Sequence, residues 1–349
     1  MHFSGLLRFC LIICCILTLS KVHAQTLGGN TAYNFLKLPY TPPLTASGGV
    51  NISDPAQDVS LALNNPALLH PSLHAQLGLN FTQLVAGVKG YQLAGAWHDQ
   101  KWNTTFGAQV IFLNYGQIQA TDAAGNGMGQ FRATDYVVQL SAGQAYLQKW
   151  HYGGSLKFIQ SSYQPYSSSA LAIDVGMNYI DTVNNLSIAV LAKNMGAQIK
   201  SYAGESEELP FDLQLGITKK LAKAPFAFSL TLQQLHRFDL LYNDTTFNEE
   251  TSIPVSASFA NKVMQHVVFA SHIIISKQLE AIVGYNHLRR TDLSVGTVGN
   301  GLAGFSIGVA ARFEKLHFSY ARSTYQRGIS YNQLGLNLLL NKLFGAGLF

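Results

Sequence analysis

The chain has 349 residues, of which 48% are hydrophobic and only 12% are charged, and its formal net charge is +5. So few charges are unusual for a soluble surface, yet beyond residue 24 there is no run of about eighteen apolar residues that could form a membrane helix. Lys and Arg do not cluster with aromatic residues, which argues against nucleic-acid binding. The apolar residues must therefore be distributed over strands.

Residues 1–24 have the features of a secretory signal peptide. Arg8 gives a positive start, an apolar stretch runs from Leu11 to Leu19, and Val22-His23-Ala24 is a small-x-small cleavage site, so cleavage before Gln25 is expected. Lipoprotein processing at a leader cysteine would need small residues just before it, which are missing. All three cysteines lie in this leader, so the mature chain would have no thiol for a disulfide, a metal site or catalysis.

Residues 25–74 do not have the pattern of a strand. Prolines at 39, 42 and 43 remove backbone donors, and a glycine pair at 48 and 49 offers no side chains to pack. A short helix is expected between Asp58 and Leu69. Because a large barrel would otherwise enclose a water-filled lumen, this segment predicts an N-terminal lumenal plug. Its marker residues are Gly48, Gly49, Asn64, Asn65 and Pro66.

Residues 75–349 contain segments of about ten residues in which every second residue is apolar. In 211–218, for example, apolar residues at odd positions alternate with polar or small residues at even positions. Lipid outside and a polar lumen inside produce this pattern, so the sequence predicts an all-β, transmembrane antiparallel β-barrel. About fourteen strands are predicted, at 75–84, 91–98, 104–115, 134–146, 151–162, 169–180, 186–195, 210–220, 226–236, 264–275, 278–288, 303–313, 316–324 and 330–340.

Connection lengths predict the orientation of the barrel. The connections after the even-numbered strands are short, as periplasmic turns are, whereas the others include the longest and should face the cell exterior. An even strand count places both termini in the periplasm. Residues 253–259 also alternate, but counting them would break the parity, so they are placed in a loop before a short helix near 261–265. The longest loops are 116–133, 196–209, 237–263 and 289–302.

No catalytic site, metal site or cofactor is predicted. His70 and His74 are four residues apart, but Pro71 interrupts the helix they would need and no carboxylate or cysteine completes a set, so two plug histidines are the better interpretation. No Gly-x-Ser-x-Gly elbow occurs, which favours a non-enzymatic protein. Arg289 and Arg290 follow a strand, where they would either contact lipopolysaccharide phosphates in bidentate fashion or form an ordinary extracellular rim.

Several segments together carry a family resemblance, and they are 33–40, 48–54, 64–69, 261–266, 284–290 and 303–306. They resemble the PorV/PorQ family of the Bacteroidetes type IX secretion system, over nearly the whole mature chain. The resemblance implies a FadL-like outer-membrane barrel that holds partner proteins where secreted cargo is attached to lipopolysaccharide, with PorZ as direct partner and PorU and PorV in the same assembly. Gln265 stands where the family often has Arg.

The loop from Arg237 to Val263 is the predicted partner-binding surface, because it mixes apolar anchors with acidic residues. The anchors are Phe238, Leu240, Leu241, Tyr242 and Phe247. The main alternative is a FadL-type outer-membrane transporter of hydrophobic compounds. That function would need an opening in the wall and an apolar lumenal pocket, whereas the inward faces carry polar residues such as Asp174, Gln214 and Glu280. A surface esterase or protease would need a convergent triad, which the sequence does not indicate.

Overall fold

The computed structural model describes residues 31–55, 57–122, 124–202, 204–240, 258–292, 301–326 and 329–345. The predicted signal peptide, 1–24, and three predicted anchors, Leu241, Tyr242 and Phe247, lie outside these ranges. The helices in the described ranges are all too short or too polar to cross a bilayer.

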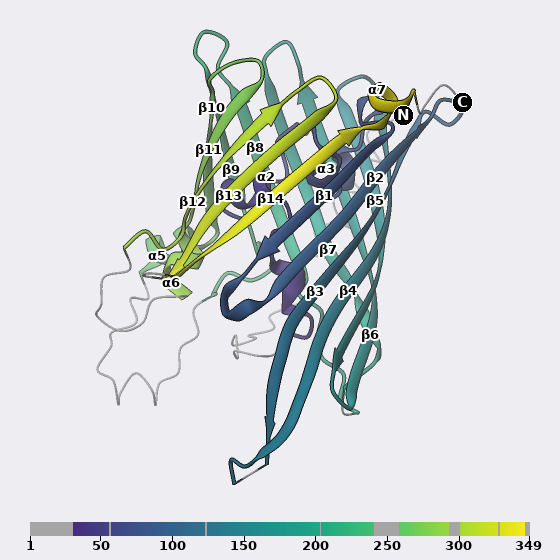
Figure 1. Ribbon diagram of the computed structural model, residues 1–349. Helices are drawn as coiled ribbons and strands as arrows, with labels where there is room; N and C mark the ends of the chain where they lie inside the picture. Colours follow the sequence, from purple (N-terminus) through teal and green to yellow (C-terminus); the bar gives the residue numbers. More distant parts are fainter. Residues whose placement is uncertain are drawn as a thin grey trace, which may run out of the picture.

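Fourteen antiparallel strands form a closed barrel, in which each strand pairs with its sequence neighbours and β1 pairs with β14 (Figure 1). This confirms the predicted fold class and strand number. The strands are β1 Gln76–Gln83, β2 Lys89–Asp99, β3 Thr104–Thr121, β4 Gly127–Tyr146, β5 Trp150–Tyr163, β6 Tyr166–Asp181, β7 Leu186–Lys200, β8 Asp212–Lys220, β9 Phe226–Leu232, β10 Val267–Ile274, β11 Leu279–Asn286, β12 Phe305–Arg312, β13 Leu316–Gln326 and β14 Ile329–Leu339.

The apolar and polar residues that alternate in the sequence lie on opposite faces of the barrel wall. In β6, Ile173 and Val175 are about half exposed, at 48% and 51%, whereas Asp174 between them is fully buried. Successive side chains of a strand point to opposite faces, so the apolar set lies outside and the polar set inside. An apolar outer band over a polar interior is the architecture of outer-membrane barrels.

The two ends of the barrel differ. Short connections, at 100–103, 147–149, 182–185, 221–225, 275–278 and 313–315, lie at what we call the turn end, which is the upper end in Figure 1. A short helix after the last strand, α7 (Leu340–Phe344), lies there too. The opposite loop end carries α5 (Phe259–Gln265), α6 (His287–Asp292) and the far end of the β3–β4 hairpin. The helix predicted near 261–265 is confirmed in α5, and residues 253–257 lie outside the described ranges.

The loop predicted at 116–133 is wrong, because most of it belongs to strands. β3 and β4 continue to pair beyond the wall, from Gln117 with Arg132 to Thr121 with Gly127, with one register shift just before Gln117 and another between Gln119 and Thr121. The Asp122 carboxylate closes the tip by accepting hydrogen bonds from the backbone N–H groups of residues 124 and 126 at 2.9 and 2.8 Å. The segment lacked a strand pattern because a ribbon that leaves the bilayer meets water on both faces, so alternation is not required. Two other strand ends also differ from the prediction. β7 continues to residue 200, where an end at 195 was predicted, and β11 stops at residue 286, where an end at 288 was predicted.

Which end faces the cell exterior is a prediction from connection length, and the projecting hairpin tests it. A protease site inserted at Gly125, in the hairpin tip, should be cut on intact cells, because exposed tips are the preferred sites of proteolysis. The same insertion at Asn184, in a turn at the opposite end, should be cut only after the outer membrane is opened. Immunoblotting of both variants measures the cleavage, and the reverse pattern would invert the orientation.

The N-terminal segment lies inside the barrel, where the purple ribbon of Figure 1 crosses the interior. Side-chain caps fix its short helices: Thr41 accepts from the N–H of Leu44, and Asp58 accepts from the N–H of Ser60 at 2.7 Å. Proline occupies the first positions of three of them, where its missing donor costs nothing. The helices are η1 Asn34–Lys37, α2 Pro42–Ala46, α3 Val59–Ala62, η2 Pro66–Leu68 and η3 Pro71–Leu73, and η4 Val85–Gly87 follows β1.

Candidate functional site

The Asn64-Asn65-Pro66 motif holds the N-terminal segment against itself and against the wall. Asn65 donates from Nδ2 to the carbonyl of Ile52 at 2.8 Å and accepts from the N–H of Ala67, while Asn64 accepts from Lys193 Nζ at 2.6 Å. Asn65 is fully buried. Because buried amides are costly unless they are hydrogen-bonded, this motif fixes how the segment folds within the lumen.

Glycines of the wall make room for this motif. An added Cβ at Gly143, on β4, would lie 2.5 Å from the carbonyl oxygen of Pro66, and one at Gly153, on β5, would overlap the Pro66 backbone. At Gly176, on β6, it would overlap the Asn65 side chain. Three neighbouring strands therefore have no side chain where this motif approaches the wall.

The Gly48-Gly49 pair makes the second contact with the wall, and here both glycines have positive φ, at 87° and 91°. The carbonyl of Gly48 accepts hydrogen bonds from Asn286 Nδ2 at 3.0 Å and from Arg289 Nη2 at 3.1 Å. All five predicted marker residues thus lie within the barrel. Whether the segment closes the lumen to solutes stays a prediction.

Arg289 and Arg290 make internal contacts at the loop end. Arg289 also donates to Ser323 Oγ at 2.8 Å, and its guanidinium lies 5.6 Å from the ring centre of Tyr325. Arg290 donates to the carbonyls of Gly301 and Ala303. These contacts give Arg289 a role in holding the N-terminal segment, and contact with lipopolysaccharide stays a prediction for both residues.

The inner wall is polar on both sides of the segment. A ladder of buried amides crosses neighbouring strands, from Asn80 to Gln92, Gln109 and Gln139, with hydrogen bonds of 3.0, 2.5 and 2.8 Å. Gln139 in turn donates to the carbonyl of Leu63 in the segment at 2.9 Å. Because each amide is satisfied by the next, the ladder fixes the register of the segment against the wall.

A buried ion pair joins β5 to β6 on the inner wall. Lys157 Nζ lies 2.6 Å from Asp174 Oδ2, and the two side chains are 5% and 1% exposed. The pair also holds Asn194, which has a positive φ of 59°: Asp174 accepts from its N–H, and Lys157 donates to its Oδ1, each at 2.8 Å. The β6–β7 ladder shifts register beside it, between Ile173 and Val175.

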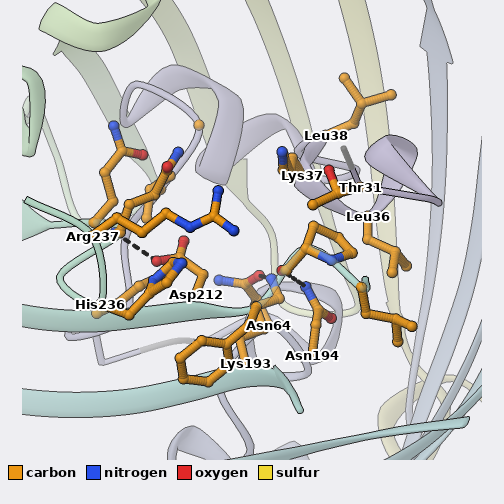
Figure 2. Close-up of a pocket in the computed structure, with 18 of the residues that line it drawn as sticks. Thr31, Leu36, Lys37, Leu38, Asn64, Lys193, Asn194, Asp212, His236 and Arg237 are labelled. Atoms are coloured by element: carbon orange, nitrogen blue, oxygen red, sulfur yellow. Dashed lines mark hydrogen bonds between the residues drawn. The ribbon is translucent and has the colours of Figure 1, made fainter. Parts of the chain in front are cut away.

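A cavity of about 190 Å³ opens between the segment and the loop end (Figure 2). Its charged lining includes Lys193, Asp212, His236 and Arg237. Asp212 accepts from the N–H of Gln234 at 2.6 Å, and burial lowers the pKa of His236, so its imidazole is neutral at pH 7. This cavity combines fixed charges with a small volume, which suits a small polar ligand or ordered water.

A larger cavity, of about 530 Å³, opens at the turn end. Here β10, β11 and β12 contribute His272, Glu280 and Arg312, and the N-terminal segment contributes Asp54 and Asp58. The sequence indicated that residue 280 faces inward, but it gave no reason to single out His272. The missing signal is spatial, because these residues meet only after three strands pair in register.

An apolar patch lies at the loop end beside the predicted partner loop. We call Phe238, Phe259, Val263 and Met264 the loop-end apolar patch. Phe238 and Phe259 are 57% and 71% exposed, and their ring centres lie 5.9 Å apart. Residues 259 and 263 are four apart in α5, so they share one face of the helix. Of the two predicted anchors that are described, Phe238 is exposed and Leu240 is buried.

The histidines considered for a metal site have other contacts. His70 Nδ1 lies 2.9 Å from Ser72 Oγ, and His74 Nδ1 accepts from the N–H of His98 at 3.0 Å. Within the described ranges, no group of three or more His, Cys, Asp or Glu side chains is placed to hold a metal ion.

Known proteins share the fold of this chain but not its sequence. No family model and no curated protein matches the sequence. The structure is similar to the TodX monoaromatic hydrocarbon channel in its ΔS2 mutant form, with a TM-score of 0.52 and 11% identity over 86% of this chain and 98% of that one. This chain has the same barrel fold as that channel. The P. putida toluene transporter TodX and a Pseudomonas aeruginosa FadL homologue give TM-scores of 0.49 and 0.44, with 11% and 10% identity over 86% and 80% of this chain and 97% and 94% of theirs.

Proposed function

We propose that this chain is a non-enzymatic outer-membrane docking barrel of the type IX secretion attachment complex. It would hold a PorZ-like surface protein directly, with PorU and PorV in the same assembly, where cargo is joined to lipopolysaccharide. The loop-end apolar patch carries the proposal, together with the family resemblance of the sequence. Aromatic side chains that are more than half exposed and grouped at one end of a barrel fit the buried centre of a protein interface.

The interior of the barrel supports docking over transport. The cavities at the loop end and the turn end have charged linings, and amide hydrogen bonds tie the N-terminal segment between them to the wall. A hydrophobic solute would have to displace the water that hydrates these polar groups, and their desolvation is unfavourable. A protein bound at the loop end needs no path through the lumen.

Passage of a hydrophobic compound is the second candidate, and the fold comparison favours it, because TodX is a hydrocarbon channel. An apolar hollow of about 630 Å³ on the outer wall, over β1, β2, β3, β13 and β14, also supports it. Its lining includes Phe81, Tyr91 and Phe112. However, backbone pairing runs unbroken beneath it, from Gln76 with Leu339 to Gln83 with Asn332, so entry to the lumen there would require the wall to open.

Substitution of Phe238 and Phe259 by Ser tests the docking proposal. The double variant should assemble normally but release its surface partner, since central aromatic anchors each contribute about 2 kcal/mol or more to binding, roughly a thirtyfold change in affinity per anchor. Quantitative affinity purification of the native complex measures the retained partner. Phe313→Ser is the matched control, because Phe313 is also 57% exposed but lies at the turn end.

The two candidates predict different outcomes for this variant. Undiminished partner retention in the double variant would remove the loop-end apolar patch as the docking site. Loss of hydrophobic-compound uptake, with the partner still bound, would favour transport. Equal loss of the partner in the Phe313→Ser control would indicate general damage to the barrel.

A further inference from the structure

The cavity at the turn end contains a buried histidine, His272, whose Nε2 atom has no hydrogen-bond partner. The His272 side chain is 4% exposed, and its Nδ1 lies 2.7 Å from Glu280 Oε1. Arg312 pairs with the other oxygen of Glu280. The guanidinium stabilises Glu280 as a carboxylate, which can only accept, so Nδ1 carries the proton and donates it.

The free nitrogen faces a carboxylate across a gap. His272 Nε2 has no hydrogen-bond partner, and Asp54 Oδ2 lies 3.9 Å from it, too far for a direct hydrogen bond. Both residues line the cavity. Buried polar atoms normally have hydrogen-bond partners, so a group bound between His272 and Asp54 would supply the missing hydrogen bonds to both.

The charges deep in the cavity favour a cation. Three carboxylates, those of Asp54, Asp58 and Glu280, face one guanidinium, that of Arg312. At the mouth, Lys220 at the end of β8 and Lys277 in the turn at 275–278 are exposed. The other carboxylate of the lining, Asp181, is already paired with Lys149 at 2.9 Å and bonded to Asn184.

We infer that the turn-end cavity binds a primary ammonium group between Asp54 and His272. An ammonium has three donors and no acceptor, so it would donate to the Asp54 carboxylate and, once the imidazole is neutral, to Nε2 of His272. Its alkyl chain would lie along the apolar part of the lining, which includes Leu61 and Ile282. The group can come from a free alkylamine or from a lysine side chain of a protein at this end of the barrel. This inference is independent of the docking proposal.

Calorimetric titration of the purified full-length barrel in detergent tests the site. The probes are n-butylamine and its neutral analogue 1-butanol, at about pH 9, well above the ordinary pKa of histidine, because the two carboxylates beside His272 favour its protonated form. Butylamine should bind at least about tenfold more tightly than butanol, because only the ammonium satisfies both groups with a charged donor. Asp54→Asn should weaken butylamine binding by about tenfold or more, whereas the control Asp181→Asn should change it less than about twofold, since Asp181 is already paired.

A spectroscopic readout needs no variant. The ¹⁵N resonance of His272 Nε2 should shift when butylamine is added and stay in place when butanol is added. A peptide with one lysine, compared with its norleucine analogue, distinguishes the sources: binding of the lysine peptide supports a protein source, and binding of butylamine alone supports a small amine.

Three results would overturn the inference. Equal affinity for butylamine and butanol would show an apolar cavity without ammonium recognition. Equal weakening by Asp54→Asn and Asp181→Asn would show a general effect of acidity at the mouth. Absence of both binding and a His272 shift would show that water alone fills the gap.

Discussion

Substitution of Asp174 by Ala should lower the free energy of unfolding by about 3–5 kcal/mol, since it leaves a buried ammonium without its partner. The Lys157 ammonium cannot reach solvent, because its side chain is only 5% exposed. The substitution also removes the acceptor that holds the Asn194 N–H, at a position where the backbone has positive φ. Equilibrium unfolding in urea, followed by tryptophan fluorescence in lipid vesicles, measures the change.

Two further variants separate charge from packing. Lys149→Ala removes a cation whose side chain is 47% exposed in its pair with Asp181, so its effect should be clearly smaller. The double substitution of Lys157 by Met and Asp174 by Leu should recover much of the loss, since a well-packed apolar pair avoids desolvating two charges. An Asp174→Ala barrel as stable as the parent would contradict the role assigned to the pair.

Deletion of residues 31–73, with the predicted signal peptide kept, should make the barrel conduct ions. A wall of fourteen strands encloses more space than its inward side chains fill, so removal of the segment leaves a water-filled passage. Single-channel recording in planar bilayers measures this directly. If the variant without residues 31–73 inserts but conducts no more than the parent protein, the segment does not close the lumen.

A point substitution provides a second test in case the deletion variant does not insert into the membrane. Gly153→Val places a side chain where an added Cβ already overlaps the Pro66 backbone. It should displace the segment while leaving β5 paired, because valine favours strands. Gly154→Val is the control, since an added Cβ there would meet only the Asp174 carbonyl oxygen at 3.7 Å, which is ordinary contact. Only Gly153→Val should raise the conductance.

Strand number and facing could be predicted because lipid imposes period two on every segment that crosses it. In β6 and β8 the residues that alternate in the sequence are those that alternate in exposure, as Ile173 and Asp174 do. The pattern fails where that constraint ends. The β3–β4 ribbon beyond residue 114 is paired but has polar residues and glycines on both faces, so sequence alone did not separate it from a loop.

The candidate sites were only partly predictable. Gly48, Gly49 and the Asn64-Asn65-Pro66 motif stood out because glycine, asparagine and proline have special backbone properties. His272 and Lys157 did not, since a lone ionisable residue on an alternating strand looks like any inward-facing polar residue. Their partners lie on other strands or in the N-terminal segment, and closure of the barrel brings them together.

The closed wall around the N-terminal segment imposes an order of assembly. The seam between β1 and β14 joins the two ends of the barrel sequence, so it is the least local pairing in the fold and should form last. The segment contacts wall residues far along the chain, as in the hydrogen bonds of Gly48 with Asn286 and of Pro39 with Gln333. We therefore expect the segment to dock on the open sheet before the seam closes, so that the strands that follow it in the chain wrap around it.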